Sequence, residues 1–143
     1  KGVYSKDKDY DKYELATKIY TPSYISLETV FGSAGMTFQY YKSIFVMSYM
    51  TKEIECDGQK YSYNKIKDSI LTSQAGIESR ENYNIASPER AFLDVIYLHK
   101  DYYFDNLNSL DWEKVNEILP IYGGNKRMAK IVKMYQKLKN NKL

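Results

Sequence analysis

The segment that most constrains the fold is an apolar stretch in the second half of the chain. Residues 87–99 read Ser-Pro-Glu-Arg-Ala-Phe-Leu-Asp-Val-Ile-Tyr-Leu-His. Ser87 is a favourable helix N-cap, and Pro88 follows at the first helical position, where its missing N–H is tolerated. The helix expected over Glu89–His99 is apolar on nearly every side, so it must be buried on nearly every side. We therefore expect it to be the central helix of the core.

Three charged residues, Glu89, Arg90 and Asp94, interrupt this apolar helix. Arg90 and Asp94 are four residues apart, so they share a face of the helix and can pair there. One interpretation is a functional carboxylate site, because perturbed acids gather at active sites. The favoured interpretation is a buried structural pair, in which Arg90 also donates to a main-chain carbonyl at a strand end. Two carboxylates without a base, a nucleophile or a metal do not make a reaction.

The middle of the chain has the pattern of β-structure. Asp57-Gly58 predicts a type I′ hairpin turn, because both central positions of that turn need positive φ. The strands that it joins, and three others, are predicted from short runs rich in β-branched and aromatic residues: 43–50, 52–56, 60–66, 69–77 and 82–86.

Two helices are expected before this β-rich region. Aromatic and apolar residues recur at helical spacing over 10–20, and Pro22 ends the first helix, since the residue before a proline disfavours helix. Ser26 is the expected N-cap of a second helix that buries apolar residues of the segment 27–34. Gly35 then stands where the end of a helix favours a left-handed residue.

The last third of the chain predicts two further helices, one from Asp111 to Pro120 and one that continues toward the C-terminus. The final helix has an apolar stripe of Met128, Ile131, Val132, Tyr135 and Leu138. No acid occurs from 125 to 143, where there are seven basic residues: Lys126, Arg127, Lys130, Lys133, Lys137, Lys139 and Lys142.

Four of these basic residues, Lys126, Lys130, Lys133 and Lys137, form a row opposite the apolar stripe. Together with Arg127 they are the candidate contact residues of the chain. Three interpretations of this row are open. It is a solvated face whose lysines complement the helix dipole, or it contacts nucleic-acid phosphate, or it contacts an acidic protein. Lysines alone do not favour base-specific recognition, and the net charge of +3 limits the feature to a local patch.

The sequence offers few groups for catalysis. Its one histidine, His99, ends the apolar helix, and its one cysteine, Cys56, precedes the hairpin turn. Neither has a partner at a spacing that indicates nucleophilic catalysis, and no residues have metal-ligand spacing. We expect no catalytic residue, no metal, no cofactor and no enzyme activity. The single cysteine and the lack of an apolar run of about 20 residues favour a cytoplasmic protein without a membrane partner.

Tyrosine is abundant, with 16 residues against 5 Phe and 1 Trp. A tyrosine combines a large rigid face with a hydroxyl, which suits interfaces. A genome-wide bias toward Tyr and Lys explains the composition equally well. The expected contact candidates among the tyrosines are Tyr40, Tyr41, Tyr102 and Tyr103.

Two segments resemble one family. The first is Pro-Ser-Tyr-Ile-Ser-Leu-Glu over 22–28, which includes Pro22, Ser23, Tyr24 and Ser26. It resembles the signature that follows the winged helix in AbiEi-type antitoxins of type IV toxin–antitoxin systems. The second is Ala-Ser-Pro-Glu-Arg-Ala-Phe-Leu-Asp over 86–94, which includes Pro88, Glu89, Arg90 and Asp94. It is similar to that family's A-x-P-E-[KR]-A-hydrophobic-L-D block, and the order and spacing of the two segments also match.

The resemblance implies a domain that helps to neutralise a nucleotidyltransferase-like toxin of the AbiEii type. Such systems act in the abortive infection response of bacteria to phage. It implies that the full-length protein represses its own operon through an N-terminal winged helix-turn-helix bound to operator DNA. Residues 1–6 are then the end of the wing strand, and 7–143 are the antitoxin effector domain. The helix-turn-helix itself is missing from this chain.

The alternative hypothesis is a DNA-binding transcriptional regulator without a toxin partner. In that case this domain dimerises the protein or adds non-specific affinity for DNA phosphate. Under either hypothesis the expected fold class is α+β: a short antiparallel or mixed sheet in the middle, packed by N-terminal helices and a C-terminal helical bundle.

Overall fold

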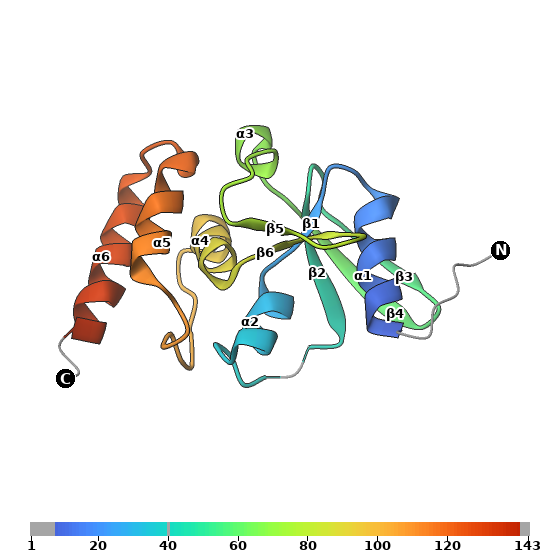
Figure 1. Ribbon diagram of the computed structural model, residues 1–143, viewed down its shortest axis with the longest axis horizontal. Helices are drawn as coiled ribbons and strands as arrows, with labels where there is room; N and C mark the ends of the chain where they lie inside the picture. Colours follow the sequence, from blue (N-terminus) through green and yellow to red (C-terminus); the bar gives the residue numbers. More distant parts are fainter. Residues whose placement is uncertain (1–7, 40, 141–143) are drawn as a thin grey trace.

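A computed structural model describes residues 8–39 and 41–140 of the chain. The fold is α+β, with a mixed six-stranded sheet between α1 on one face and the remaining large helices on the other (Figure 1). The expected fold class is therefore confirmed. The predicted wing-strand remnant, 1–6, lies outside the described residues.

The helices are α1 Lys8–Ile19, α2 Glu28–Ala34, α3 Asp68–Leu71, α4 Pro88–Leu98, α5 Trp112–Ile118 and α6 Lys126–Asn140, with a 3-10 turn, η1, at Leu119–Tyr122. The strands are β1 Tyr24–Ile25, β2 Ser43–Ser48, β3 Lys52–Cys56, β4 Gln59–Lys65, β5 Ile77–Ser79 and β6 Asn84–Ala86. The strand order in the sheet is β3-β4-β2-β1-β6-β5.

β1, the shortest strand, lies in the middle of the sheet. β1 pairs antiparallel with β2 and parallel with β6, so it joins the two halves of the sheet. Tyr24 and Ile25 point to opposite faces, because successive side chains alternate along a strand. Tyr24 belongs to the large core shared with α2, α4, α5 and α6, whereas Ile25 belongs to the smaller core under α1.

Several local predictions are confirmed. Asp57 and Gly58 have φ of 52° and 77°, as the predicted type I′ turn requires. Ser87 caps α4 by accepting a hydrogen bond from the Arg90 main-chain N–H, and Gly35 ends α2 in the left-handed conformation. Residues 89–96 of α4 are all buried, so the apolar helix is the central one.

Two local predictions are wrong. The segment 69–77 is not a strand: most of it forms α3 and a loop, because Ile70 and Leu71 enter the core from a single helical turn. Ser26 is not the N-cap of α2, whose N-cap is Leu27. The Ser26 side chain is fully buried and turned toward α4 instead.

Candidate functional site

The first candidate site is a buried polar network around Arg90, whose side chain has no exposed surface. Its guanidinium donates to the main-chain oxygens of Ser73 and Ala75 at 3.1 and 2.6 Å. It also donates to the Ile70 oxygen at 2.7 Å and to the Tyr24 hydroxyl at 2.9 Å. The carbonyls come from α3 and the loop after it, and not from a strand end. Arg90 thus ties that irregular segment to the central helix.

Asp94 is the acidic centre of the same network and is fully buried. Its carboxylate accepts from the Tyr122, Tyr24 and Ser26 hydroxyls at 2.6, 2.7 and 3.0 Å. Arg90 Nε lies 3.4 Å from Asp94 Oδ1, which confirms the predicted pair. Three segments of the chain, residues 24–26, α4 and η1, therefore meet at one carboxylate.

The titration behaviour of this network follows from its burial. Burial raises the pKa of Tyr24 and Tyr122 well above the ordinary value, and the Asp94 charge raises both further. Burial also raises the pKa of Asp94, against the lowering effect of Arg90 and the three hydroxyls. Every one of these groups has a protein partner. The network is thus built to hold the fold together.

The other residues of the two motifs also have structural contacts. Glu89 is 6 % exposed and accepts from the Asp111 main-chain N–H at 2.9 Å, which holds the start of α5. Pro88 opens α4, and the buried Ser23 hydroxyl donates to the Thr17 oxygen of α1. Pro22 lies exposed in the turn between α1 and β1. Apart from Pro22, these motif residues therefore mark packing positions.

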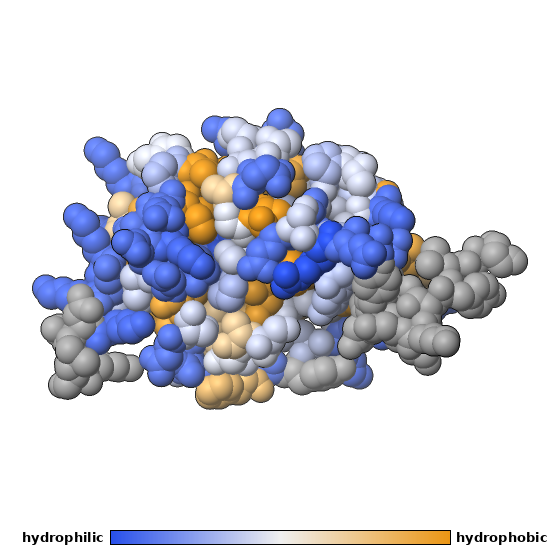
Figure 2. All heavy atoms as spheres, viewed as in Figure 1, coloured by the Kyte–Doolittle hydropathy of each residue, from blue (hydrophilic) through white to orange (hydrophobic). Residues whose placement is uncertain are grey.

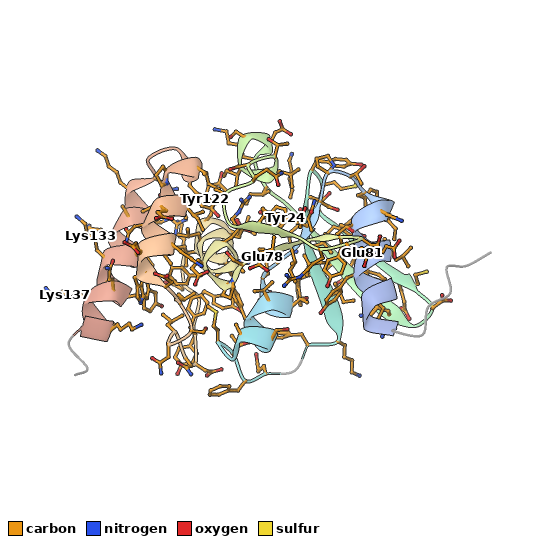
Figure 3. The ribbon with its side chains drawn as sticks, in the orientation of Figure 1. Tyr24, Glu78, Glu81, Tyr122, Lys133 and Lys137 are labelled. Atoms are coloured by element: carbon orange, nitrogen blue, oxygen red, sulfur yellow. The ribbon has the colours of Figure 1, made fainter. Side chains whose placement is uncertain are left out.

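The second candidate site is the outer face of α6. Lys126, Lys130, Lys133 and Lys137 are exposed, and Figure 3 shows the latter two pointing away from the body of the molecule. Hydrophilic residues dominate the end of the molecule formed by α6 (Figure 2). Arg127 does not belong to this row. It is half-buried, and its Nη2 donates to the Tyr97 oxygen at 3.1 Å, because it faces the end of α4.

The tyrosines expected at a contact surface divide into different environments. Tyr103 is 79 % exposed, whereas Tyr41 and Tyr102 are half-buried. The Tyr102 hydroxyl donates to Glu28 at 2.8 Å, and burial together with Glu28 raises its pKa. Tyr40 lies outside the described residues. Tyr103 is therefore the one described member of this set that is fully available to a partner.

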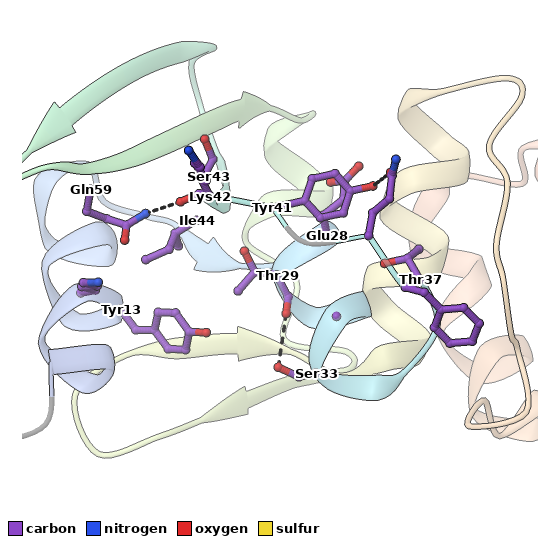
Figure 4. A pocket seen from close by; sticks show the side chains of 14 residues that line it. Tyr13, Glu28, Thr29, Ser33, Thr37, Tyr41, Lys42, Ser43, Ile44 and Gln59 are labelled. Atoms are coloured by element: carbon purple, nitrogen blue, oxygen red, sulfur yellow. Dashed lines mark hydrogen bonds between the residues drawn. The ribbon is translucent and has the colours of Figure 1, made fainter.

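A polar hollow of about 460 Å³ lies between α1, α2 and the start of β2 (Figure 4). Much of its polar lining is engaged within the fold. The Thr29 hydroxyl accepts from the Phe45 N–H, and the Gln59 amide donates to the Lys42 oxygen. Glu28 already accepts from Tyr102. The hollow presents no acid paired with a base or nucleophile in the part of the chain that is described.

The remaining candidates for chemistry, His99 and Cys56, lie on different elements of the fold. His99 is exposed at the end of α4, and Cys56 is half-buried at the end of β3. Over 8–39 and 41–140, no three His, Cys, Asp or Glu side chains are grouped so that they could bind a metal ion. No helix within these ranges has the length and apolar character needed to cross a membrane.

The sequence predicts the Arg90–Asp94 pair and the lysine row, but it does not predict two members of the network. No sequence feature singles out Tyr122, and the local sequence at Ser26 favours a helix cap. The one signal that could have found Ser26 was its place in the same motif as Tyr24. Comparison with protein-family models, curated proteins and solved structures finds no match to this chain.

Proposed function

We propose that this chain is the partner-binding domain of an AbiEi-type antitoxin, which helps to neutralise a nucleotidyltransferase-like toxin in the cytoplasm. One observation carries the proposal. The two segments that resemble the family, 22–28 and 86–94, lie far apart in the sequence but meet in one buried network. Two chance resemblances would have no reason to contact each other. Their contact supports the proposal that this chain has the fold of that family, and a common fold supports a common role.

The proposed role is binding and not catalysis. Glu89 and Asp94 would be the natural acid–base candidates, but both carboxylates already accept hydrogen bonds within the fold. The exposed lysine row of α6 has the opposite character, because it faces solvent and can contact another molecule. In the full-length protein, repression of the operon belongs to the winged helix-turn-helix that the resemblance implies.

Co-expression of the full-length protein with the toxin encoded beside it tests this proposal. We expect relief of growth arrest and co-purification of the toxin with this domain. Full toxicity in the presence of folded full-length protein would contradict the proposal. Relief without co-purification would instead place neutralisation in transcription, and so outside this domain.

A second candidate function is favoured by one observation, the row of exposed lysines on a helix without acids. Such a row can add non-specific affinity for DNA phosphate to a transcriptional regulator that has no toxin partner. Duplex DNA binding should then fall steeply with salt. Lys130→Glu, Lys133→Glu and Lys137→Glu together should weaken it for all sequences alike. Binding that is insensitive to both changes excludes this function.

A further inference from the structure

The outer flank of α6 carries apolar side chains that the fold leaves uncovered. Met134 and Leu138 are 50 % and 52 % exposed, and Ile131 is half-buried because it also packs against the large core. Their spacing of three and four residues places them on one line along the helix. We call this line the apolar seam of α6. It includes Ile131 and Leu138 of the predicted apolar stripe and borders the core-facing side of the helix, where Met128 and Val132 are 0 % and 1 % exposed.

Lysines run along one side of the apolar seam. Lys130, Lys133 and Lys137 are exposed, and each immediately precedes a seam residue in the sequence. α6 contains no acidic residue. A narrow apolar line edged by charges of one sign is the pattern with which a helix selects a partner helix. The complementary surface is a helix with apolar residues along its own seam and glutamate or aspartate beside them.

An aromatic recess lies at the C-terminal end of the apolar seam. It has a volume of about 590 Å³, and Leu138, Tyr135, Trp112 and Phe38 are among the residues that line it. Phe38 is 74 % exposed, so an aromatic ring stands uncovered at this recess. The Trp112 indole N–H is buried and has no hydrogen-bond partner in the described structure. Interfaces concentrate their binding energy in such aromatic recesses, where a partner side chain is anchored.

We propose that the apolar seam and the aromatic recess bind an acidic amphipathic helix of a partner protein. The seam supplies the apolar contact, the lysines pair with acids along its edge, and the recess holds one anchoring side chain. This inference rests on the proposed function, because it names the surface that the toxin would use.

Charge decides against a second copy of this chain as the occupant. Two α6 helices packed along their seams would bring together lysines of the same sign with no acid between them. The apolar residues decide against nucleic acid. Phosphate contacts would use the lysines but would leave Met134, Leu138 and Phe38 exposed, with nothing to bury them. An acidic helix satisfies both sets of side chains.

The probe is a synthetic peptide of about 21 residues, three heptads with Leu at the a and d positions and Glu at e and g. Its matched control carries Lys in place of Glu. We expect the chain to bind the acidic peptide and not the basic one in calorimetry. The double variants Met134→Glu/Leu138→Glu and Lys130→Glu/Lys137→Glu should each weaken binding about tenfold or more.

The matched control variant is Lys52→Glu/Lys65→Glu, which reverses two exposed lysines on β3 and β4 at the opposite end of the molecule (Figure 1). It should change the affinity less than about twofold. Equal binding of the two peptides, or binding unchanged by Met134→Glu/Leu138→Glu, overturns the inference. Duplex DNA and anionic vesicles are run beside the peptides. A further outcome is that DNA binds more tightly than the acidic peptide and loses affinity only in the lysine variant. In that case the face binds phosphate, and the inference is also overturned.

The toxin itself separates this inference from the proposed function. If the acidic peptide binds through α6 but the folded chain does not bind the toxin, the surface stands and the proposed function fails. If wild-type chain and Met134→Glu/Leu138→Glu bind the toxin equally well, the proposed function stands and the inference fails. The substituted side chains are half-exposed, so circular dichroism should show the same fold in every variant.

Discussion

The Arg90 network and the outer face of α6 both present cations, but the first is closed to solvent and the second faces it. Arg90 has no exposed surface and donates to three main-chain oxygens, a tyrosine and Asp94. Lys130, Lys133 and Lys137 are exposed on a helix without acids. A buried charge is tolerated only where its surroundings satisfy it completely, so it fixes the positions of its neighbours. An exposed charge fixes little and stays available to another molecule.

The difference also explains what the family resemblance reports. Hydrogen bonds from the residues of both motifs join α1, β1, α3, α4 and α5. The surface argued to bind a partner lies on α6, which neither motif includes. Under the proposal, the residues that carry the family resemblance and the residues that bind the partner are different parts of this molecule, because packing constrains the first set and a partner constrains the second.

Of the changes considered, high pH should cause the largest loss of stability in the buried part of the molecule. Burial raises the pKa of Tyr61 to about 12, from an ordinary value of 10.0, and raises those of Tyr24 and Tyr122 well above 10. The unfolded chain therefore loses these protons first. The stability that the protonated tyrosines contribute is complete below about pH 10 and is lost as the pH rises through their folded-state values. Part of the tyrosinate absorbance of the 16 tyrosines should therefore appear only together with the loss of the circular dichroism signal. Formation of all the tyrosinates without loss of structure would argue that these buried hydroxyls reach solvent.

Asp94→Ala should have the largest effect among single substitutions. It leaves the Arg90 guanidinium buried without its acid and removes the acceptor of three hydroxyls. We expect a loss of about 3–5 kcal/mol in the free energy of unfolding, measured by urea denaturation. Asp101→Ala, at an exposed position after α4, should cost less than about 0.5 kcal/mol. Similar losses in the two variants would remove the distinction between buried and exposed charge.

Gly76→Ala tests how closely the α3 loop packs on Arg90. Gly76 has a φ of 74°, and an added Cβ would lie 2.6 Å from Ile118 Cδ1 and 2.9 Å from Arg90 Cβ. Overpacking together with the left-handed backbone should cost about 3 kcal/mol. Gly32→Ala is the matched substitution, since its Cβ would meet nothing within 4 Å in α2. It should be neutral or stabilising by up to about 1 kcal/mol in the same denaturation experiment.

Tyr24→Phe removes a single hydroxyl from the network. That hydroxyl accepts from Arg90 and donates to Asp94, so its loss leaves both charges with one partner fewer. We expect a loss of about 2 kcal/mol in thermal or chemical unfolding. Tyr103→Phe, at a 79 % exposed position, should change stability by a few tenths of a kcal/mol at most. A neutral Tyr24→Phe would show that Arg90 and Asp94 suffice without it.

Lys133→Glu with Lys137→Glu should have the smallest effect on stability. Both side chains are exposed, so the free energy of unfolding should change by less than about 0.5 kcal/mol per site. Partner binding should nevertheless fall. A large loss of stability here, read from the melting temperature, would mean that the lysine row supports the fold.

The sequence predicted the parts of the fold that depend on neighbouring residues. The apolar run of α4 required burial on nearly every side, Ser87-Pro88 started the helix, and Asp57-Gly58 made the turn. Of the candidate site, the Arg90–Asp94 pair was predictable because four residues along a helix place two side chains on one face. These results follow from backbone geometry that operates within a few residues.

The tertiary structure decided what depends on distant residues. Tyr24 and Ile25 form the central strand, but two residues cannot show the alternation that identifies a strand. Ser26 lies 68 residues from Asp94 in the sequence. The Ser26 hydroxyl donates to the Asp94 carboxylate, and it does not form the helix cap that the local sequence favours. The segment 69–77 was apolar enough for a strand, yet its carbonyls turn toward Arg90. A buried charge must be satisfied wherever its partners come from, so local preference gave way to it at Ser26 and in the segment 69–77.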